Sequence, residues 1–275
     1  MRPTRSHSTA ALPRIERDGA RLRWRDEGAG RPWLLMHGWA LDLDVWGPVS
    51  DVLAGAARVL RFDRRGYGES TGEPSLAADA ADALAVLDAA GVAQCAIVGM
   101  SQGARVAAML AREHPARVSH VVLDGAPALE GLADDDHEPE FPLQRYRDAL
   151  ASGGHAALAA LLERHPLLQL QRPTDTSTAL LHRLLLRYPA TDLAVRRATP
   201  PHRAPADATF TQPTLIVNGG HDSRVRLRIG ASLARALPRA TREVLADCGH
   251  LACLDDPAGY VTALVDFLSR TPESA

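Results

Sequence analysis

Short apolar runs alternate with longer Ala- and Leu-rich segments along most of the chain. Seven of the runs have the length and composition of β-strands, namely residues 21–26, 33–36, 58–62, 94–98, 118–123, 214–218 and 242–245. Helices are predicted over residues 76–90, 102–113 and 256–268. Because strands that alternate with helices form βαβ units, the pattern predicts an α/β protein with a mainly parallel sheet.

The alternation stops between residues 126 and 207. An acidic stretch over residues 133–140 is followed by Leu-rich helical patterns around 143–165 and 176–188, with no strand-like run. A disordered linker is the alternative, but disordered segments lack such a density of leucine. We therefore predict a helical cap over residues 126–207, inserted into a core of residues 21–125 and 208–275, with a flexible tail over residues 1–20.

Composition and charge exclude several kinds of chemistry. The 31 basic and 33 acidic residues give a formal net charge of −2, which offers no electrostatic reason to expect a nucleic-acid partner. Every basic residue is an arginine, because the 275-residue sequence contains no lysine. A Schiff-base lysine and a phosphate-loop lysine are therefore excluded.

The cysteines and the longest uncharged stretch bear on the location of the protein. Cys95, Cys248 and Cys253 are too few, and odd in number, for a disulfide framework, which favours a reducing compartment. The longest stretch without an acidic or basic residue, 89–104, is too short and too polar to span a bilayer. Since residues 1–12 also lack the apolar region of a secretory signal, we expect a cytoplasmic protein with no membrane partner.

The strongest chemical signal is a Gly-x-Ser-x-Gly motif at residues 99–103. It directly follows a predicted strand and directly precedes a predicted helix, a setting in which a tight turn exposes the hydroxyl of Ser101. Glycines at positions 99 and 103 remove side chains that would collide across such a turn. A glycine-rich turn without chemistry is the alternative, but the flanking elements favour a nucleophilic serine.

A nucleophilic serine needs a general base, and His250 is the best candidate among eleven histidines. His250 lies in the loop between the last predicted strand and the last predicted helix, at the same edge of the sheet as Ser101. His221 and His37 also follow predicted strands and are the competing candidates.

The base in turn needs a carboxylate that holds it in the correct tautomer. Asp222 follows the penultimate predicted strand, and Asp124 ends an earlier one. Either aspartate preserves the chain order serine, aspartate, histidine that is described for hydrolases with a nucleophile elbow. The order therefore leaves both carboxylates open.

Four motifs, in this order, resemble those of the α/β-hydrolase fold superfamily over residues 21–269. They are His37-Gly38, the stretch DRRGYGES at residues 63–70, the serine motif at residues 99–103, and Gly249-His250 followed by Asp256-Pro257. The resemblance implies the α/β-hydrolase fold, with a mostly parallel eight-stranded sheet flanked by helices and a helical cap inserted after strand six. It also selects the acid, because residues 219–222 match the family's loop after strand seven.

The resemblance implies a role for each site residue. Ser101 is expected as the nucleophile, His250 as the base and Asp222 as the acid. The backbone N–H groups of Trp39 and Gln102 are expected to form the oxyanion hole.

Two further roles are expected near the oxyanion loop. Trp39 and His37 are placed at the substrate-binding site, where Trp39 lines the acyl pocket and His37 orients the oxyanion loop without transferring protons. In the stretch 63–70, Asp63 and the arginines are expected to make local hydrogen bonds rather than to take part in catalysis.

These roles predict a serine hydrolase that cleaves a small carboxylic ester or lactone through an acyl-enzyme on Ser101. Serine rather than aspartate at the elbow disfavours the haloalkane dehalogenase and epoxide hydrolase branches. The expected partner is a small-molecule substrate of a monomer or homodimer. No cofactor and no metal are expected, since no clustered ligand spacing occurs.

Other functions fit the same three residues. A C–C bond hydrolase, a perhydrolase or an acyltransferase would use the same triad with a different substrate or acceptor. A receptor-like member of the fold would bind a ligand with little turnover, but such a protein is favoured by a damaged triad, and here all three residues are present.

Overall fold

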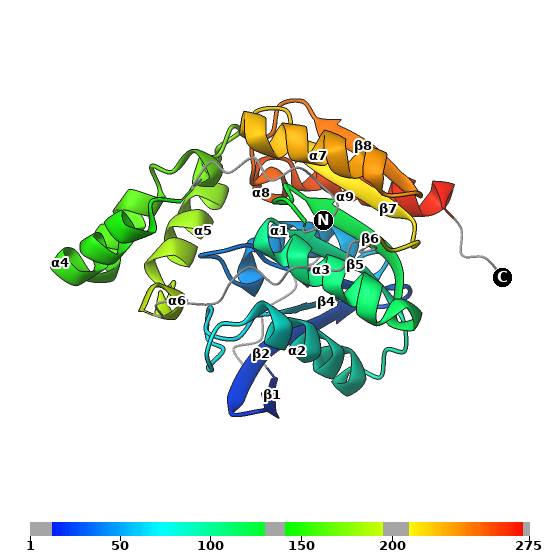
Figure 1. The fold of residues 1–275 in the computed structure, drawn as a ribbon, viewed down its shortest axis with the longest axis horizontal. Coiled ribbons are helices and arrows are strands. Elements are labelled where there is room, and N and C mark those ends of the chain that lie inside the picture. Colours follow the sequence, from blue (N-terminus) through cyan, green and yellow to red (C-terminus); the bar gives the residue numbers. More distant parts are fainter. Residues whose placement is uncertain (1–12, 130–140, 195–208, 272–275) are drawn as a thin grey trace, which may run out of the picture.

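The computed structural model describes residues 13–129, 141–194 and 209–271. Eight strands form one sheet in the order β1-β2-β4-β3-β5-β6-β7-β8 (Figure 1). Their bounds are β1 Arg14–Arg17, β2 Ala20–Gly28, β3 Pro32–Met36, β4 Arg58–Phe62, β5 Cys95–Met100, β6 Val118–Asp124, β7 Thr214–Gly219 and β8 Ala240–Leu245. Only the pairs β1–β2 and β2–β4 are antiparallel, so the predicted mostly parallel, eight-stranded sheet is confirmed.

Helices cover both faces of the sheet, which explains why the central strands are apolar along their whole length. Every residue of β5 is buried, for example. Neighbouring residues of β3 point to opposite faces, so Trp33 and Leu35 join one hydrophobic cluster whereas Leu34 and Met36 join the other. The sheet thus separates two clusters of buried side chains.

Each cluster is completed by its own helices. Helices α1 (Gly47–Leu53), α8 (Ala252–Asp255) and α9 (Pro257–Arg270) supply the first cluster. Helices α2 (Leu76–Ala89), α3 (Gln102–Glu113) and α7 (Arg224–Ala236) supply the second. Within the described residues, short 3-10 turns lie at Leu43–Trp46, Pro115–Arg117 and Pro166–Leu168.

The sequence analysis predicts α2, α3 and α9 but not α1 or α7. The predicted helices begin or end at clear signals, such as Pro257 in the first turn of α9, preceded by Asp256, whose side chain accepts the Gly259 N–H. In the first turns of α7, arginines at positions 224, 226 and 228 hide the helical period. The signal that identifies α7 is Ser223, whose hydroxyl accepts the Arg226 N–H as an N-cap.

The prediction of a flexible tail over residues 1–20 is wrong where the structure describes that segment. Strand β1 pairs with β2 through a tight turn in which Asp18 and Gly19 have φ values of 45° and 73°. An Asp-Gly pair favours this kind of hairpin turn, because both residues tolerate positive φ. Residues 1–12 lie outside the described residues.

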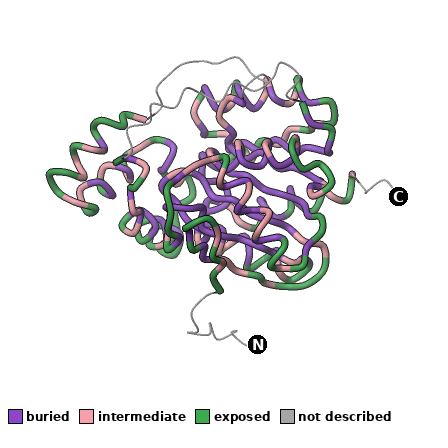
Figure 2. The backbone as a smooth tube through the Cα atoms, turned by 60° about the horizontal axis from the view of Figure 1, so that its bottom comes forward, coloured by how far each residue is buried: buried purple, intermediate pink, exposed green. Residues whose placement is uncertain are grey.

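A group of helices lies between β6 and β7, as the predicted cap requires. It consists of α4 (Leu143–Leu162), α5 (Asp175–Leu186) and α6 (Thr191–Ala194). The cap is predicted over residues 126–207. Its first predicted residue lies just before the undescribed segment 130–140, and its last lies in the undescribed segment 195–208. Figure 2 shows the cap beside the core, with buried positions facing inward and exposed ones outward.

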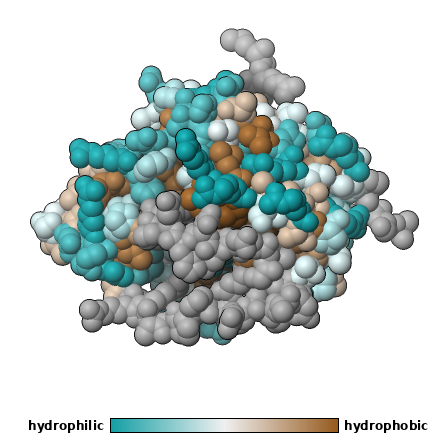
Figure 3. All heavy atoms as spheres, turned by 45° about the horizontal axis from the view of Figure 1, so that its top comes forward, coloured by the Kyte–Doolittle hydropathy of each residue, from teal (hydrophilic) through white to brown (hydrophobic). Residues whose placement is uncertain are grey.

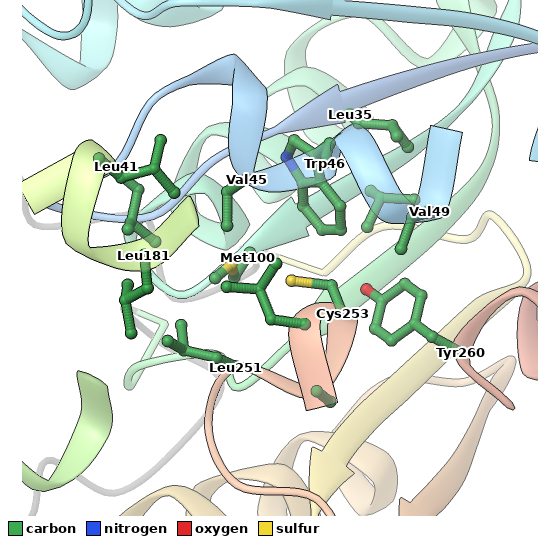
Figure 4. Close-up of a cluster of buried hydrophobic side chains, with 14 of the residues drawn as sticks. Leu35, Leu41, Val45, Trp46, Val49, Met100, Leu181, Leu251, Cys253 and Tyr260 are labelled. Carbon is green, nitrogen blue, oxygen red and sulfur yellow. The ribbon is translucent and has the colours of Figure 1, made fainter. Parts of the chain in front are cut away.

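The cap and the core share one hydrophobic cluster. Leu181 of α5 lies close to Met100 at the end of β5, to Leu41 and to Leu251 (Figure 4). On the other side of this cluster Trp46 packs against Tyr260 of α9, with ring centroids 5.9 Å apart. Trp46 is therefore a core residue, as the sequence analysis expects, and the cap is attached to the core by apolar contacts.

Hydrophilic side chains surround separate hydrophobic patches on the face drawn in Figure 3. Among the described residues, the large hydrophobic side chains that are exposed are Val52, Leu143, Leu186, Val244 and Val265. Of the helices in the described ranges, none combines the length and hydropathy that a membrane crossing needs.

Candidate active site

Ser101 lies on a strained turn between β5 and α3. Its backbone has φ 51° and ψ −117°, a conformation that a residue with a side chain rarely adopts. A Cβ on Gly99 would lie 2.4 Å from the Gly103 carbonyl oxygen, and a Cβ on Gly103 would lie 2.6 Å from that of Met36. Both positions therefore require glycine, which is the steric basis of the motif.

His250 and Asp222 meet at the carboxyl end of the sheet. The Nδ1 atom of His250, in the loop between β8 and α8, lies 3.0 Å from Oδ2 of Asp222, which follows β7. The other oxygen of Asp222 accepts the Ser223 N–H at 2.7 Å. Because both side chains are buried, the carboxylate holds the imidazole ring in one orientation.

Gly125, directly after β6, packs against the imidazole ring of His250. A Cβ on Gly125 would lie 2.6 Å from Cε1 of His250, and the residue has a φ of 51°. The imidazole ring therefore packs directly against backbone that follows β6, and a larger residue there would displace it.

Ser101 and His250 face one enclosed pocket of about 10 Å³, roughly the space of one water molecule. Apart from these two residues, its lining is mainly apolar and comes from both the core and the cap. The lining residues are Gly38, Trp39, Leu41, Met100, Phe141, Leu167, Leu168 and Leu251. This pocket brings the predicted nucleophile, the predicted base and Trp39 together.

The competing histidines lie elsewhere. His221 is exposed, whereas His37 is completely buried and is not part of the pocket lining. Both ring nitrogens of His37 are engaged, Nδ1 with the Gly38 carbonyl oxygen at 2.8 Å and Nε2 with the Arg64 N–H at 3.0 Å. The structure thus supports the predicted orienting role of His37 but does not support its contact with substrate.

The competing carboxylate, Asp124, has a different partner. It is fully buried at the end of β6 and accepts a hydrogen bond from the Tyr260 hydroxyl at 3.1 Å. Burial, together with the charge of Asp222 nearby, raises the pKa of Asp124 to about 8. The geometry therefore pairs His250 with Asp222, and the raised pKa of Asp124 favours its protonated form at neutral pH.

The side chains of the two predicted oxyanion residues are held away from the serine. Nε1–H of Trp39 donates to Asp192 of α6 at 2.6 Å. Oε1 of Gln102, the first residue of α3, accepts from Nη2 of Arg64 at 2.6 Å. Sequence reasoning missed Asp192, and no signal along the chain indicates it, since its contact depends on how the cap is placed.

The stretch 63–70 makes the local hydrogen bonds that the sequence analysis expects. Asp63 accepts the Leu43 N–H at 2.9 Å and the Glu69 N–H at 2.8 Å, and it forms an ion pair with Arg23 at 2.7 Å. Burial raises the pKa of Asp63 to about 6, and the negative charge of Asp42 acts in the same direction. These contacts fix the loop that lies beside the oxyanion residues.

A larger groove of about 760 Å³ lies in the cap next to the pocket. Glu163 directly after α4, residues of α5 and the chain between the two helices line it, and Leu168 belongs to the lining of both the groove and the pocket at Ser101. Leu168 thus separates the small enclosed space at Ser101 from a larger open one.

One cysteine lies close to His250 in the sequence. Cys248 is buried two residues before His250, and burial raises the pKa of its thiol to about 11. The described parts of the chain hold no group of three His, Cys, Asp or Glu side chains that is arranged to bind a metal ion.

Comparison with known families finds a match to the α/β hydrolase fold over residues 32–257. The chain is 29% identical to a 2-hydroxymuconate semialdehyde hydrolase of Pseudomonas sp. (strain CF600), with 94% of this chain and 93% of that protein covered. It is 26% identical to a pimeloyl-[acyl-carrier protein] methyl ester esterase of Photobacterium profundum, with 90% and 98% covered. Among solved structures, an enol-lactonase of Burkholderia xenovorans LB400 matches with a TM-score of 0.74 and 25% identity, covering 94% of this chain and all of that one.

Proposed function

The chain belongs to the α/β hydrolase fold family, and we propose that it is a serine hydrolase that acts on a small carboxylic ester or lactone. The proteins to which it is similar include a methyl ester esterase and an enol-lactonase. One observation carries the proposal. Ser101, on its strained turn, and His250, oriented by Asp222 at 3.0 Å, face the same enclosed pocket.

The first half of the proposed reaction acylates the serine. Asp222 accepts the Nδ1–H of His250, which leaves Nε2 of the neutral ring to take the proton from the Ser101 hydroxyl. The Ser101 oxygen bonds to the carbonyl carbon, and the carbonyl oxygen takes the electron pair. The backbone N–H groups of Trp39 and Gln102 bind the resulting oxyanion.

The second half returns the serine to its starting state. The tetrahedral intermediate expels the alkoxide, which takes the proton from His250 as it leaves. His250 then removes a proton from water, whose oxygen attacks the acyl carbon. The carboxylic acid is released, and Ser101 recovers its proton from His250.

The lining of the pocket favours a neutral, apolar acyl group. Its walls are formed by Trp39, Met100, Leu168 and other apolar side chains, and no arginine belongs to the lining among the described residues. A carboxylate buried there without a cationic partner would be costly to desolvate. An uncharged ester or lactone avoids this cost.

A second candidate is the hydrolysis of a carbon–carbon bond. The 29% identity to a 2-hydroxymuconate semialdehyde hydrolase favours including such a substrate in any assay. The apolar lining argues against it, because 2-hydroxymuconate semialdehyde carries a carboxylate. We therefore expect ester hydrolysis to exceed hydrolysis of this substrate in kcat/KM.

The proposal is tested by labelling and turnover. A fluorophosphonate probe is expected to modify wild-type protein at one serine, identified as Ser101 by peptide mapping. The same preparation is expected to hydrolyse p-nitrophenyl acetate and butyrate, and 2-hydroxymuconate semialdehyde is assayed beside them.

The control is Ser101→Ala, which should lose both labelling and turnover while keeping the thermal unfolding temperature of the wild type within a few degrees. If the wild type is not labelled and hydrolyses no ester, lactone or thioester, the proposed function is wrong. A preference for 2-hydroxymuconate semialdehyde over every ester would replace the first candidate by the second.

A further inference from the structure

One buried arginine contacts both Gly38, which lines the pocket, and Gln102, which directly follows Ser101. Arg64 lies in the loop between β4 and α2 and is 1% exposed. Its Nη2 atom donates to the Gly38 carbonyl oxygen at 3.2 Å and to Oε1 of Gln102 at 2.6 Å. We propose that Arg64 is a positioning residue that orients the two backbone donors of the oxyanion hole, an inference that rests on the function proposed above.

The first contact acts through the geometry of one peptide bond. In a trans peptide the carbonyl oxygen and the following N–H point in opposite directions, and the described residues include no cis peptide. When Arg64 holds the Gly38 oxygen, the Trp39 N–H must point to the other side. The peptide lies beside the serine, since a Cβ on Gly38 would lie 3.3 Å from Cβ of Ser101, and the proposed direction of the Trp39 N–H is toward Ser101.

His37 provides a second donor to the same carbonyl oxygen. Nε2 of His37 accepts the Arg64 N–H, so the neutral ring carries its proton on Nδ1 and donates it to the Gly38 oxygen at 2.8 Å. Complete burial and the positive charge of Arg64 lower the pKa of His37 well below its usual value, which keeps the ring neutral. Two donors therefore fix the Gly38–Trp39 peptide.

The second contact acts on the first residue of α3. The Gln102 side chain accepts from Arg64 and also, at 3.3 Å, from the Tyr67 hydroxyl. A side chain held at its end restricts the backbone to which it is attached, so the Gln102 N–H keeps its direction. A cation beside the Gly38 carbonyl additionally polarises that amide and makes its N–H a stronger donor.

Arg64 is itself held firmly. Nη1 donates to Asp79 of α2 at 3.0 Å, and the guanidinium carbon lies 4.6 Å from the centre of the Tyr67 ring. The guanidinium thus keeps its charge in the interior with a carboxylate partner and an aromatic ring. Such a fixed group suits a role in orientation.

The chain offers a matched control for the test. The neighbouring Arg65 pairs with Asp82, also on α2, at 2.7 and 2.6 Å, and both side chains are buried. The contacts of Arg65 run to Asp82 and not to Gly38 or Gln102. The double variants Arg64→Met/Asp79→Asn and Arg65→Met/Asp82→Asn each remove one buried ion pair without leaving a lone charge.

The first double variant is expected to lower kcat for p-nitrophenyl butyrate by about 10- to 100-fold, with KM changed by less than about 3-fold. The inhibition constant of an alkyl trifluoromethyl ketone is expected to rise by the same factor as kcat/KM falls, because this compound forms an oxyanion on the serine. The Arg65 variant is expected to stay within about 3-fold of the wild type in all three quantities.

Equal losses in the two double variants, or a loss of kcat without a change in the ketone constant, would show that Arg64 acts only on stability. If the Arg64 variant does not fold by circular dichroism, Gln102→Leu supplies the test, since it removes the side-chain contact and keeps the backbone N–H. Its expected loss in kcat is about 3- to 10-fold, with a matching change in the ketone constant, and unchanged values contradict the inference. A wild type without esterase activity would instead contradict the proposed function.

Discussion

The core and the cap contribute to the same pocket in different ways. On the core side, backbone geometry holds the reacting groups, as in the positive φ of Ser101 and the packing of His250 against Gly125. On the cap side, Phe141, Leu167 and Leu168 contribute apolar side chains. We infer that the core determines which reaction takes place, whereas the cap determines which substrate fits.

The two parts are joined by polar contacts as well as by the shared hydrophobic cluster. Arg187, directly after α5, pairs with Asp42 and Asp44 at 2.7 and 2.6 Å, and Trp39 donates to Asp192 of α6. These contacts end on the oxyanion loop and the turn after it. The cap therefore contacts the same loop that is proposed to bind the oxyanion. These contacts fix the position of the cap side chains that line the pocket relative to the proposed oxyanion hole.

The largest expected effect concerns the carboxylate that orients His250. Asp222→Asn is expected to lower kcat/KM for an activated ester by about 10⁴-fold, because an amide cannot hold the same tautomer of the histidine. Asp124→Asn is expected to stay within about 3-fold of the wild type, since its carboxyl bonds to Tyr260 instead. Steady-state kinetics of both variants decide between the two aspartates, and a larger loss for Asp124→Asn would reverse the assignment.

The next effect tests the claim that backbone packing holds the base. Gly125→Ala is expected to lower kcat by about 100-fold, because the new Cβ displaces His250 and small displacements at a reacting group are costly. Gly91→Ala is the matched control. Gly91 also has a positive φ, of 65°, but has open space around its Cα, so the substitution introduces backbone strain alone.

Equal activity losses in Gly125→Ala and Gly91→Ala would mean that strain, and not the position of His250, limits the reaction. Thermal unfolding of both variants measures the strain directly. We expect both variants to lower Tm, Gly125→Ala by more because its new Cβ also meets His250, whereas only Gly125→Ala is expected to lower kcat.

A smaller effect is expected on the cap side. Leu168→Ala removes the side chain that separates the enclosed pocket from the larger groove. We expect kcat/KM for p-nitrophenyl octanoate to rise relative to the acetate by about 10-fold, the lower end of the range that one methylene group in an apolar pocket produces. Leu186→Ala, at an exposed position at the end of α5, is the control and should leave this ratio unchanged. A ratio that does not respond to Leu168→Ala contradicts the assignment of selectivity to the cap.

The same contrast between core and cap governs what the sequence predicts. The seven predicted strands lie within two residues of their observed ends. Five of them, β3 to β7, are almost wholly buried, and the apolar runs that this burial requires are visible in the sequence. The order of the elements also places Ser101, His250 and both candidate aspartates at one edge of the sheet, since the carboxyl ends of parallel strands meet there. The resemblance to the family then selects Asp222 over Asp124. The local sequence pattern is therefore sufficient to predict the strands and the residues at their carboxyl ends, because the backbone of the sheet fixes where these residues lie.

Prediction is weaker where long-range packing decides the outcome. The Leu-rich pattern predicts α4 and α5 but does not indicate that Leu168 reaches the pocket or that Asp192 reaches Trp39. Leucines occur on several sides of these helices, and only docking on the core selects the inward side. The ion pair of Arg64 with Asp79 likewise joins two segments that no local pattern connects.

The smallest expected effect separates the stability of the core from its chemistry. Burial raises the pKa of Asp124 from 3.8 to about 8, so between these values the folded protein binds a proton that the unfolded chain has lost. The contribution of this carboxyl to stability is complete below about pH 4 and is lost as the pH rises through 8.

Asp124→Asn tests this pH dependence. The asparagine keeps an acceptor for the Tyr260 hydroxyl, and its amide carries no charge at any pH. The Tm of this variant relative to the wild type should therefore increase from pH 4 to pH 8, by about 2 °C for each kcal/mol of stability that the wild type loses over this range. Asp51→Asn, at an exposed position, controls for the loss of one charge, and a Tm difference that stays constant with pH would contradict the protonated state of Asp124.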